Sequence, residues 1–241
     1  MPILSIRDVA KHFGGVKAIT RFSLDIEQEE IVGLIGPNGA GKTTLFNMIT
    51  GVYPLTAGEI RFKDRLLTAT TPYKACAMGI GRTFQVAKPF AGKTVLYNVM
   101  VGAFSRTNDL RRAEKKALEV LEFLGLLPKK DQLGRSLTIA DRKRLEMAKA
   151  LATDPELLLL DEVMAGLNSK ETEEAIALVR AISKRGITLL IIEHVMQVIM
   201  SLSNKIAVLY HGEKIAEGPP GQIGHDEKVI KAYLGDEYGL A

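Results

Sequence analysis

Residues 31–43 read IVGLIGPNGAGKT, and this stretch decides the fold class. Its first five residues form an uninterrupted apolar run, which is typical of a strand buried on both faces of a parallel sheet. The rest fits the pattern G-x-x-x-x-G-K-[ST], in which backbone N–H groups of a glycine-rich turn surround phosphate oxygens. A helix is predicted over about residues 42–50, ended by Gly51. The order of strand, glycine-rich loop and helix therefore predicts a phosphate-binding loop.

Two other interpretations of this loop are weaker. A glycine-rich turn with an incidental lysine has no need of a buried strand before it and a helix after it. A dinucleotide-binding loop spaces its glycines as G-x-G-x-x-G, whereas here they follow G-x-x-G-x-G and precede Lys42. In a phosphate-binding loop, the Lys42 ammonium reaches the β- and γ-phosphates and the Thr43 hydroxyl ligates Mg²⁺.

Strands and helices alternate in the C-terminal part of the chain. Buried-type strands are predicted at residues 157–160, 188–192 and 206–210. A helix is expected at about residues 169–185, where Asn168 and Glu171 have the spacing of a capping box. This alternation is typical of an α/β domain with a mostly parallel sheet.

The N-terminal and middle parts of the chain have other patterns. Short half-buried strands are predicted at residues 4–6, 24–26 and 59–62, because apolar and polar residues alternate there. Helices are predicted from about residue 108 to Gly125 and from about Asp141 to Thr153. The helical stretch of about residues 86–150 is therefore expected as an insertion between two parts of the α/β domain.

The composition is that of an ordinary globular protein. The chain has 241 residues, 46% hydrophobic and 25% charged, with a single cysteine that cannot form an internal disulfide. No secretory signal is expected, and no apolar run approaches the roughly 18 residues of a membrane span. The net charge of +4 does not by itself support contact with nucleic acid or anionic lipid. The basic runs at 111–116 and 142–144 are expected to form solvated helix faces.

A second group of polar residues follows the predicted strand at 157–160. Asp161 and Glu162 come directly after it, at the end of the strand where open α/β sheets bind ligands. Asp161 is a candidate for holding Mg²⁺, and Glu162 for polarising an attacking water. Alone, such a pair is more often a solvated turn. Together with the phosphate-binding loop, it indicates phosphoryl transfer.

With these motifs in place, the chain resembles an ATP-binding cassette (ABC) transporter ATPase over about residues 4–234. The resemblance rests also on residues 81–85 (GRTFQ), on residues 191–194 (IIEH) and on Phe13 before two glycines. It implies a P-loop NTPase fold, with a mostly parallel core sheet, an N-terminal antiparallel β subdomain and an inserted helical subdomain. The expected single domain spans residues 1–241, with its core at about 1–85 and 151–241 and its helical subdomain at about 86–150.

The resemblance also implies the site residues. Those for catalysis are Glu162, His194, Gln85 and Lys42. Those for binding ATP are Phe13, Gly36, Asn38, Gly39, Ala40, Gly41, Lys42, Thr43 and Thr44, together with Thr138 and Ala140 acting in trans on a second chain. Those for Mg²⁺ are Thr43, Gln85 and Asp161. Taken singly, Phe13 is a core candidate, His194 a satisfied histidine, and Gln85 carries almost no information.

The chain departs from the family at its signature sequence. The family has L-S-G-G-Q, or L-S-Y-G-Q in the subgroup that this chain resembles, where residues 137–141 read LTIAD. Asp141 places a carboxylate near a helix N-terminus that the family offers to phosphate. Thr138 and Asp141 have capping-box spacing, so the acid is expected to satisfy the helix's own N–H groups. The segment is either a tolerated variant or a weakened one, and two composite ATP sites of unequal strength are one hypothesis.

The subgroup that the chain is most similar to is the ATP-binding subunits of branched-chain amino-acid importers, on residues 161–168 and 229–235. The resemblance implies an ATPase that powers import of branched-chain amino acids or related small solutes. Urea or short-amide import, or a weakly catalytic nucleotide-binding regulatory subunit, are the alternatives. The implied partners are transmembrane permease subunits and a second ABC ATPase chain, identical or different, without nucleic acid. The implied location is cytoplasmic and peripheral, on the inner face of the cell membrane. The family docks its permease beside Gln85, around residues 86–97, whose apolar side chains are core candidates as well.

Overall fold

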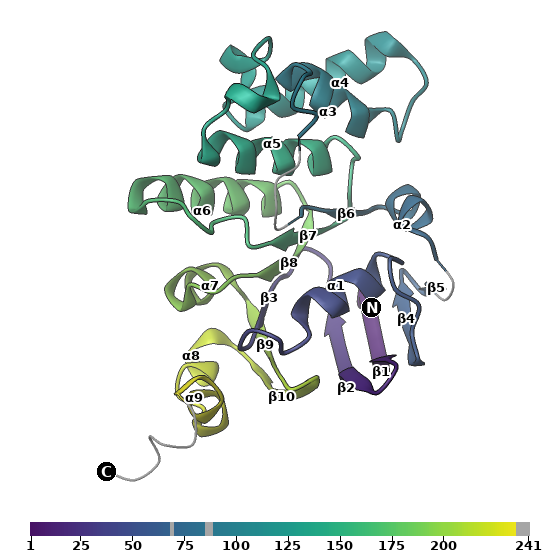
Figure 1. Cartoon of the computed structure of the whole chain (residues 1–241), viewed down its shortest axis with the longest axis vertical. Helices are drawn as coiled ribbons and strands as arrows, with labels where there is room; N and C mark the ends of the chain where they lie inside the picture. The colour runs from purple at the N-terminus through teal and green to yellow at the C-terminus, as the bar shows by residue number, and fades with distance from the viewer. Residues whose placement is uncertain (68–69, 85–88, 235–241) are drawn as a thin grey trace. The chain divides into compact units, whose positions relative to one another are not determined.

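The computed structural model describes residues 1–67, 70–84 and 89–234 (Figure 1). In chain order, the elements are β1 (Leu4–Phe13), β2 (Val16–Ile26), β3 (Ile31–Ile35), α1 (Lys42–Ile49), β4 (Ala57–Phe62), β5 (Arg65–Leu66), α2 (Pro72–Met78), β6 (Ile80–Arg82), α3 (Val95–Ala103), α4 (Leu110–Phe123), η1 (Leu127–Lys129), η2 (Gly134–Ser136), α5 (Ile139–Leu151), β7 (Leu157–Asp161), α6 (Ser169–Ser183), β8 (Thr188–Ile192), α7 (Met196–Leu202), β9 (Lys205–Tyr210), β10 (Glu213–Gly218), α8 (Pro220–Ile223) and α9 (Glu227–Leu234).

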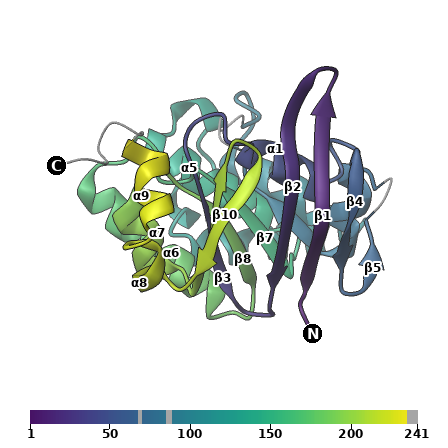
Figure 2. The same cartoon turned by 90° about the horizontal axis from the view of Figure 1, so that it is seen from below.

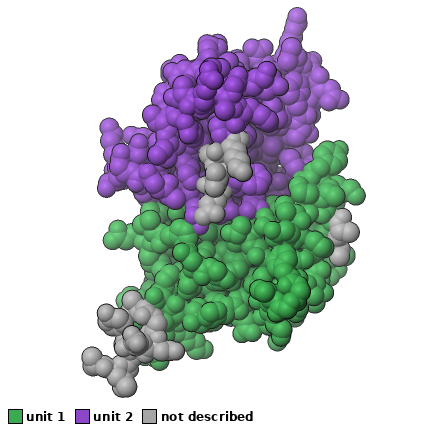
Figure 3. Space-filling model, in the orientation of Figure 1, with its two compact units in different colours: residues 1–75, 188–241 green, residues 76–187 purple. Residues whose placement is uncertain are grey.

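The chain forms two compact units (Figure 3). Unit 1 consists of residues 1–75 and 188–241, and unit 2 is the uninterrupted stretch 76–187. Unit 1 therefore holds the predicted phosphate-binding loop, whereas unit 2 holds the Asp161–Glu162 pair and the helices α3 to α6. The expected bounds of the helical subdomain, about 86–150, lie inside unit 2 and stay a prediction.

The strands of unit 1 have the order β5-β4-β1-β2-β10-β9-β3-β8, and Figure 2 shows β10, β2, β1, β4 and β5 side by side. Strands β1, β2, β4 and β5 pair antiparallel, while β3 pairs parallel with both β8 and β9. Every residue of β3 and β8 is buried, as their continuous apolar sequences predicted. The expected fold class, with parallel core strands and antiparallel N-terminal strands, is thus confirmed.

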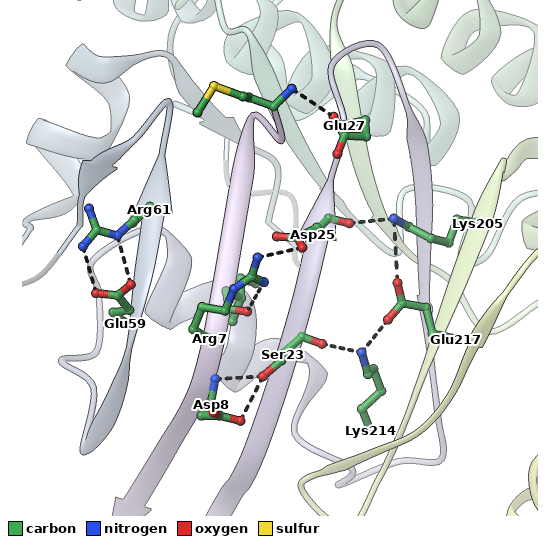
Figure 4. Close-up of polar contacts among 12 residues, drawn as sticks. Arg7, Asp8, Ser23, Asp25, Glu27, Glu59, Arg61, Lys205, Lys214 and Glu217 are labelled. Atoms are coloured by element: carbon green, nitrogen blue, oxygen red, sulfur yellow. Dashed lines mark hydrogen bonds and ion pairs between the residues drawn. The ribbon is translucent and has the colours of Figure 1, made fainter.

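Lysine side chains reinforce a thin junction between β2 and β10. The two strands share one register pair, Glu213 with Arg21. Beside it, the Nζ of Lys205 donates to the carbonyl oxygen of Asp25 at 2.6 Å, and the Nζ of Lys214 donates to that of Ser23 at 2.5 Å (Figure 4). These bonds satisfy strand carbonyls by side chains instead of by a neighbouring backbone.

Unit 2 combines a parallel pair of strands, β6 with β7, with a group of packed helices. Helix α3 packs against α4 and α5 (Figure 1). The predicted capping box of α6 is confirmed, because the side chain of Asn168 accepts from the Glu171 N–H and the Glu171 carboxylate accepts from the Asn168 N–H. Helix α5 begins at Ile139, two residues before the predicted start, since Thr138 is its N-cap.

Two further expectations for unit 2 can be compared with the structure. The basic run at 142–144 is half-buried, so the prediction of a solvated face is wrong there. The reason is that α5 turns Lys143 towards the end of β7, where its Nζ donates to the Glu162 carbonyl oxygen at 2.7 Å. Of the apolar residues around 86–97, Val95 is in the core, whereas Phe90 is exposed.

Candidate functional site

The loop between β3 and α1 has a backbone that glycine alone accommodates. Gly36 has φ +151°, and a Cβ built on it would lie 2.0 Å from the carbonyl oxygen of Leu209. Gly41 has φ +109°, and its Cβ would lie 2.6 Å from the carbonyl oxygen of Ala18. At both positions a side chain would collide with backbone. These two glycines hold the loop against β9 and β2, as a phosphate-binding loop requires.

The lysine of the motif folds back over this loop. The Nζ of Lys42 donates to the carbonyl oxygens of Gly36 at 2.6 Å and of Pro37 at 3.0 Å, and the side chain is buried. The ammonium is therefore held within the concave turn of the loop. There it is placed to meet phosphate oxygens, which are stronger acceptors than peptide carbonyls.

The N-terminus of α1 is arranged for an anion. Its N-cap, Gly41, offers no side-chain hydrogen bond within the described part of the chain, and its first turn has no acidic residue. The positive end of the helix dipole therefore meets no acidic side chain from its own first turn, which suits an external anion. Of the other predicted loop residues, Asn38, Gly39 and Thr43 are exposed, Thr44 is half-buried and Ala40 is buried.

The structure brings His194 to the same edge of the sheet as this loop. Strands β3 and β8 are parallel neighbours, with Leu34 opposite Ile192. Gly36 and His194 follow the carboxyl ends of these two strands, so both lie at the edge where α/β sheets bind ligands. His194 is exposed, which leaves its ring accessible from solvent.

Phe13 is not a core residue, because 42% of it is exposed. It ends β1 and pairs with Val16 across the β1–β2 turn. Val16 is two residues from Ala18, whose carbonyl oxygen faces Gly41 of the loop. Phe13 is therefore paired with a residue of β2 that lies two positions before the contact between β2 and the phosphate-binding loop.

In unit 2, Asp161 ends β7 inside a polar cluster of its own. Its Oδ2 accepts a hydrogen bond from Arg82 of β6 at 3.0 Å, and its N–H donates to the Thr83 hydroxyl at 3.0 Å. Burial raises the pKa of Asp161, and the hydrogen bond from Arg82 offsets this only in part, so the pKa lies above its ordinary value.

Asp161 has an oxygen atom that fits a Mg²⁺ ion. The buried Oδ1 of Asp161 finds no hydrogen-bond partner among the described residues, and a buried carboxylate oxygen without a donor is suited to a cation. Separately, in unit 1, the hydroxyl-bearing Thr43 is exposed, and a hydroxyl oxygen is also a ligand that Mg²⁺ takes. Within the described ranges, no group of three or more His, Cys, Asp or Glu side chains gathers as a metal site.

Glu162 has an unusual backbone. Its φ is +51°, a left-handed conformation that is uncommon for a residue with a side chain, and the residue is buried. The Nζ of Lys143 holds its carbonyl oxygen, and the N–H of Ala165 donates to the same oxygen at 3.3 Å. The chain thus turns sharply at Glu162, as residues held at functional sites often do.

Arg82, Thr83 and Lys143 hold the two carboxylate residues, and sequence reasoning assigned none of them this role. Arg82 and Thr83 lie in the predicted GRTFQ motif, and the parallel pairing of β6 with β7 brings them to Asp161. A prediction that these two strands are neighbours would have found them. Lys143 is separated from Glu162 by 19 residues and a change of element, so no local pattern indicates it.

The segment at 137–141 caps its own helix, but not through the predicted capping box. The N–H of Asp141 donates to the Thr138 hydroxyl at 3.2 Å, as expected. The Asp141 carboxylate, however, accepts from the Thr138 hydroxyl at 2.8 Å and from the Lys129 ammonium, not from the helix's N–H groups. The expectation is wrong because the nearby ammonium of Lys129 is a stronger donor than a backbone N–H. Ala140 beside it is half-buried.

Burial raises the pKa of Asp141, but hydrogen bonds from Lys129 and Thr138 outweigh it and leave the pKa below its ordinary value. Asp141 is thus a buried, ionised carboxylate next to the N-terminus of α5. Gln85, the remaining predicted site residue, lies outside the described residues.

Sequence comparisons give a consistent set of relatives. A family model described as "ABC transporter" matches residues 19–165, and one described as "Branched-chain amino acid ATP-binding cassette transporter" matches residues 213–239. The chain is 40% identical to the high-affinity branched-chain amino acid transport ATP-binding protein LivG of Escherichia coli K12, over 98% of both chains. It is 37% identical to the corresponding protein BraF of Pseudomonas aeruginosa, again over 98% of both.

Solved structures agree with these relatives. The ADP conformation of MJ1267, an ATP-binding cassette of an ABC transporter, is similar with a TM-score of 0.89 and 30% identity, over 98% of this chain and all of that one. A nucleotide-free ATP-binding cassette from an ABC transporter has a TM-score of 0.90 at 30% identity, with the same coverage. In the described ranges, the helices are too short or too polar to cross a membrane.

Proposed function

The chain belongs to the ATP-binding subunits of ABC transporters, which hydrolyse ATP to power transport, and from this premise we propose that it drives import of branched-chain amino acids. The match of residues 213–239 to the branched-chain family model supports this substrate class, as do the printed names of LivG and BraF. The observation that carries the ATPase itself is the open N-terminus of α1, with Lys42 held over the loop before it.

Within unit 1, the proposed roles concern binding. The N–H groups around Gly39 and Gly41 and the ammonium of Lys42 hold the phosphates. The hydroxyl of Thr43 and the start of α1, including Thr44, complete this half of the site. Phe13 stacks on the adenine base.

Chemistry at the γ-phosphate needs a water and a base. Glu162, which lies at the sharp turn of the backbone after β7, takes the proton of the attacking water. His194 contacts the γ-phosphate from the edge of β8, and Gln85 senses the state of the site. Asp161 and Thr43 would hold Mg²⁺, which neutralises charge on the phosphate oxygens when bound.

The proposed partners are permease subunits in a membrane and a second ABC ATPase chain, so the chain works as a peripheral protein on the inner face of that membrane. Phe90 and Tyr97, exposed aromatic residues of unit 2, belong to the proposed permease-docking region. Thr138 and Ala140 would act on the nucleotide that the second chain holds. A post-hydrolysis dimer has been solved for the cassette MJ0796, which shares the fold with this chain.

The ATPase assignment is tested by the mass in solution of purified Glu162→Gln, with and without Mg-ATP. Removing the base is expected to leave ATP binding intact and to trap a closed state. Hydrolysis is expected to fall by about 100-fold or more. The matched control is Glu173→Gln, the same change at an exposed position of α6, which should leave hydrolysis unchanged. A wild-type chain that binds no ATP contradicts the proposal.

The substrate class is tested in cells that carry Glu162→Gln in place of the wild-type chain. Uptake of labelled leucine is expected to be lost, while uptake of labelled urea stays the same. The opposite result would assign the chain to the importers of urea or short amides.

A second candidate function, a weakly catalytic nucleotide-binding regulatory subunit, is favoured by one observation. The Thr138 hydroxyl caps the N-terminus of α5, and the Asp141 carboxylate lies beside this end, where it accepts from the same hydroxyl. Rapid hydrolysis by the purified chain, lost in Glu162→Gln, would exclude this candidate.

A further inference from the structure

Three side chains of unit 1 form a cluster at the end of β1. The rings of Phe13 and Tyr53 meet edge to face, with centroids 5.1 Å apart and planes at 80°. The Nζ of Lys11 lies 4.9 Å from the centroid of Phe13 and 5.8 Å from that of Tyr53. One ammonium therefore contacts both aromatic rings at cation–π distance.

Lys11 is an unusual lysine because it is buried, with 9% of it exposed. Its Nζ donates to the carbonyl oxygen of Pro54 at 2.8 Å. Buried lysines are rare unless their charge is compensated. Here the two aromatic rings compensate the charge through cation–π contacts, in place of a carboxylate. The lysine thus fastens the loop that carries Tyr53 and Pro54 to β1.

The same loop is fastened to α1. The N–H groups of Val52 and Tyr53 both donate to the carbonyl oxygen of Asn47, at 2.8 and 3.1 Å. The N–H of Thr56 donates to the carbonyl oxygen of Ala10 in β1 at 2.8 Å. Helix α1 thus begins at the phosphate-binding loop and ends at the backbone that positions Tyr53. The phosphate end of the proposed site and its aromatic end are joined by one short, rigid helix.

We propose that Lys11 and Tyr53 are positioning residues that orient Phe13 for stacking on the adenine base of ATP. The proposal rests on the proposed function, because it takes Phe13 as the residue that stacks on the base. Lys11 and Tyr53 both contact the ring of Phe13, and 42% of Phe13 stays exposed beside these contacts. The ammonium also draws π-electron density through the ring, which favours stacking with an electron-rich purine.

The test separates binding of the base from binding of the phosphates. A non-hydrolysable imido analogue of ATP and inorganic tripolyphosphate, each with Mg²⁺, are titrated calorimetrically into the full chain. Lys11→Met and Tyr53→Leu are expected to lower the affinity for the ATP analogue by about 3- to 10-fold. The same variants are expected to change tripolyphosphate binding by less than about 2-fold, which also shows that the phosphate-binding loop is folded.

Two kinds of control accompany the test. Lys17→Met removes the same charge from an exposed position of β2 and should leave both affinities unchanged. The conservative variants Lys11→Arg and Tyr53→Phe keep the cation and the ring, and should restore binding of the analogue.

Each remaining outcome overturns the inference in a different way. Equal weakening of the analogue and of tripolyphosphate would mean that Lys11 and Tyr53 support the fold of the loop and have no role towards the base. If Lys11→Met and Lys17→Met lower the affinity for the analogue equally, the loss results from the change in net charge and not from the position of Lys11. If the wild-type chain binds neither probe, the proposed function is overturned as well. If the wild-type chain binds tripolyphosphate as tightly as the ATP analogue, the base contributes nothing to affinity and this inference alone is overturned.

Discussion

Two helix N-termini of this molecule have opposite chemistry. Helix α1 begins at a glycine, with no side-chain cap among the described residues and no acid in its first turn. Helix α5 has Thr138 as its N-cap, whose hydroxyl accepts from the Asp141 N–H and donates to the Asp141 carboxylate. The first end is open to an external anion, and the second is closed by the chain itself.

The difference shows what makes a helix end functional. Helices α3, α4 and α6 also have side-chain caps, at Thr94, Asp109 and Asn168. A cap typically stabilises a helix by about 1 kcal/mol, so α1 lacks a stabilising contact that these helices have. The uncapped end of α1 is suited to an anion because it follows a glycine-rich loop that holds a buried ammonium, whereas the capped end of α5 is the basis of the hypothesis of unequal composite sites. The variants below break or sharpen this comparison.

The largest effect is expected at the open end itself. Lys42→Ala removes the ammonium that is held over the loop by Gly36 and Pro37. Hydrolysis is expected to fall by about 100-fold or more, because a buried cation aimed at phosphate oxygens is lost. The measurement is steady-state phosphate release together with calorimetric ATP affinity, with Lys17→Ala as a surface control. Unchanged affinity would show that the loop does not hold the phosphates.

A second variant closes the open end. Thr44 has the same place in α1 that Asp141 has in α5, three residues after the N-cap. Thr44→Asp is expected to weaken ATP binding by about 10- to 100-fold, since a carboxylate near the phosphates is repelled. The matched control is Thr44→Asn, which has nearly the same shape without the charge. If Thr44→Asn lowers the affinity for ATP as much as Thr44→Asp does, the loss results from the shape of the new side chain and not from its charge.

The sequence was sufficient for features that depend on neighbours in the chain. Three such features are the apolar run, the glycine-rich loop, and the pair Asp161 and Glu162. The structure forms β3 from the apolar run, places the loop directly after it, and places the acidic pair at the end of β7, as predicted. The contacts that tune them are not local. Arg82 reaches Asp161 across 79 residues, because β6 and β7 pair.

The closed end of α5 illustrates the same limit. The spacing of Thr138 and Asp141 predicted a reciprocal capping box, and half of it formed. Lys129, in the neighbouring 3-10 helix η1, competes for the carboxylate. Since an ammonium is a stronger donor than a backbone N–H, the long-range packing of η1 overrides the local pattern.

A third variant opens the closed end. Ala140→Gly with Asp141→Gln removes the buried carboxylate to which the Thr138 hydroxyl donates. In the assembled transporter, turnover is expected to rise by about 3- to 10-fold, because the start of α5 becomes available to phosphate. The free energy of unfolding is expected to fall by about 1 kcal/mol, as a helix gains glycine and loses a charged contact. The two measurements, ATP turnover and chemical denaturation, should thus move in opposite directions. Unchanged turnover would count against unequal composite sites.

The smallest effect is the pH dependence of the closed end. The pKa of Asp141 lies below its ordinary value of 3.8, because hydrogen bonds from Lys129 and Thr138 outweigh the effect of burial. A carboxyl group whose pKa is lowered by folding stabilises the fold above its unfolded pKa, and this contribution is lost as the pH falls through the folded value. The wild-type chain is therefore expected to lose stability relative to Asp141→Asn below about pH 4, whereas the difference should be constant from about pH 5 to 7. Urea denaturation of both chains across this range measures it. If the difference does not change with pH, the ion pair with Lys129 contributes nothing, and the hydroxyl of Thr138 alone closes the start of α5.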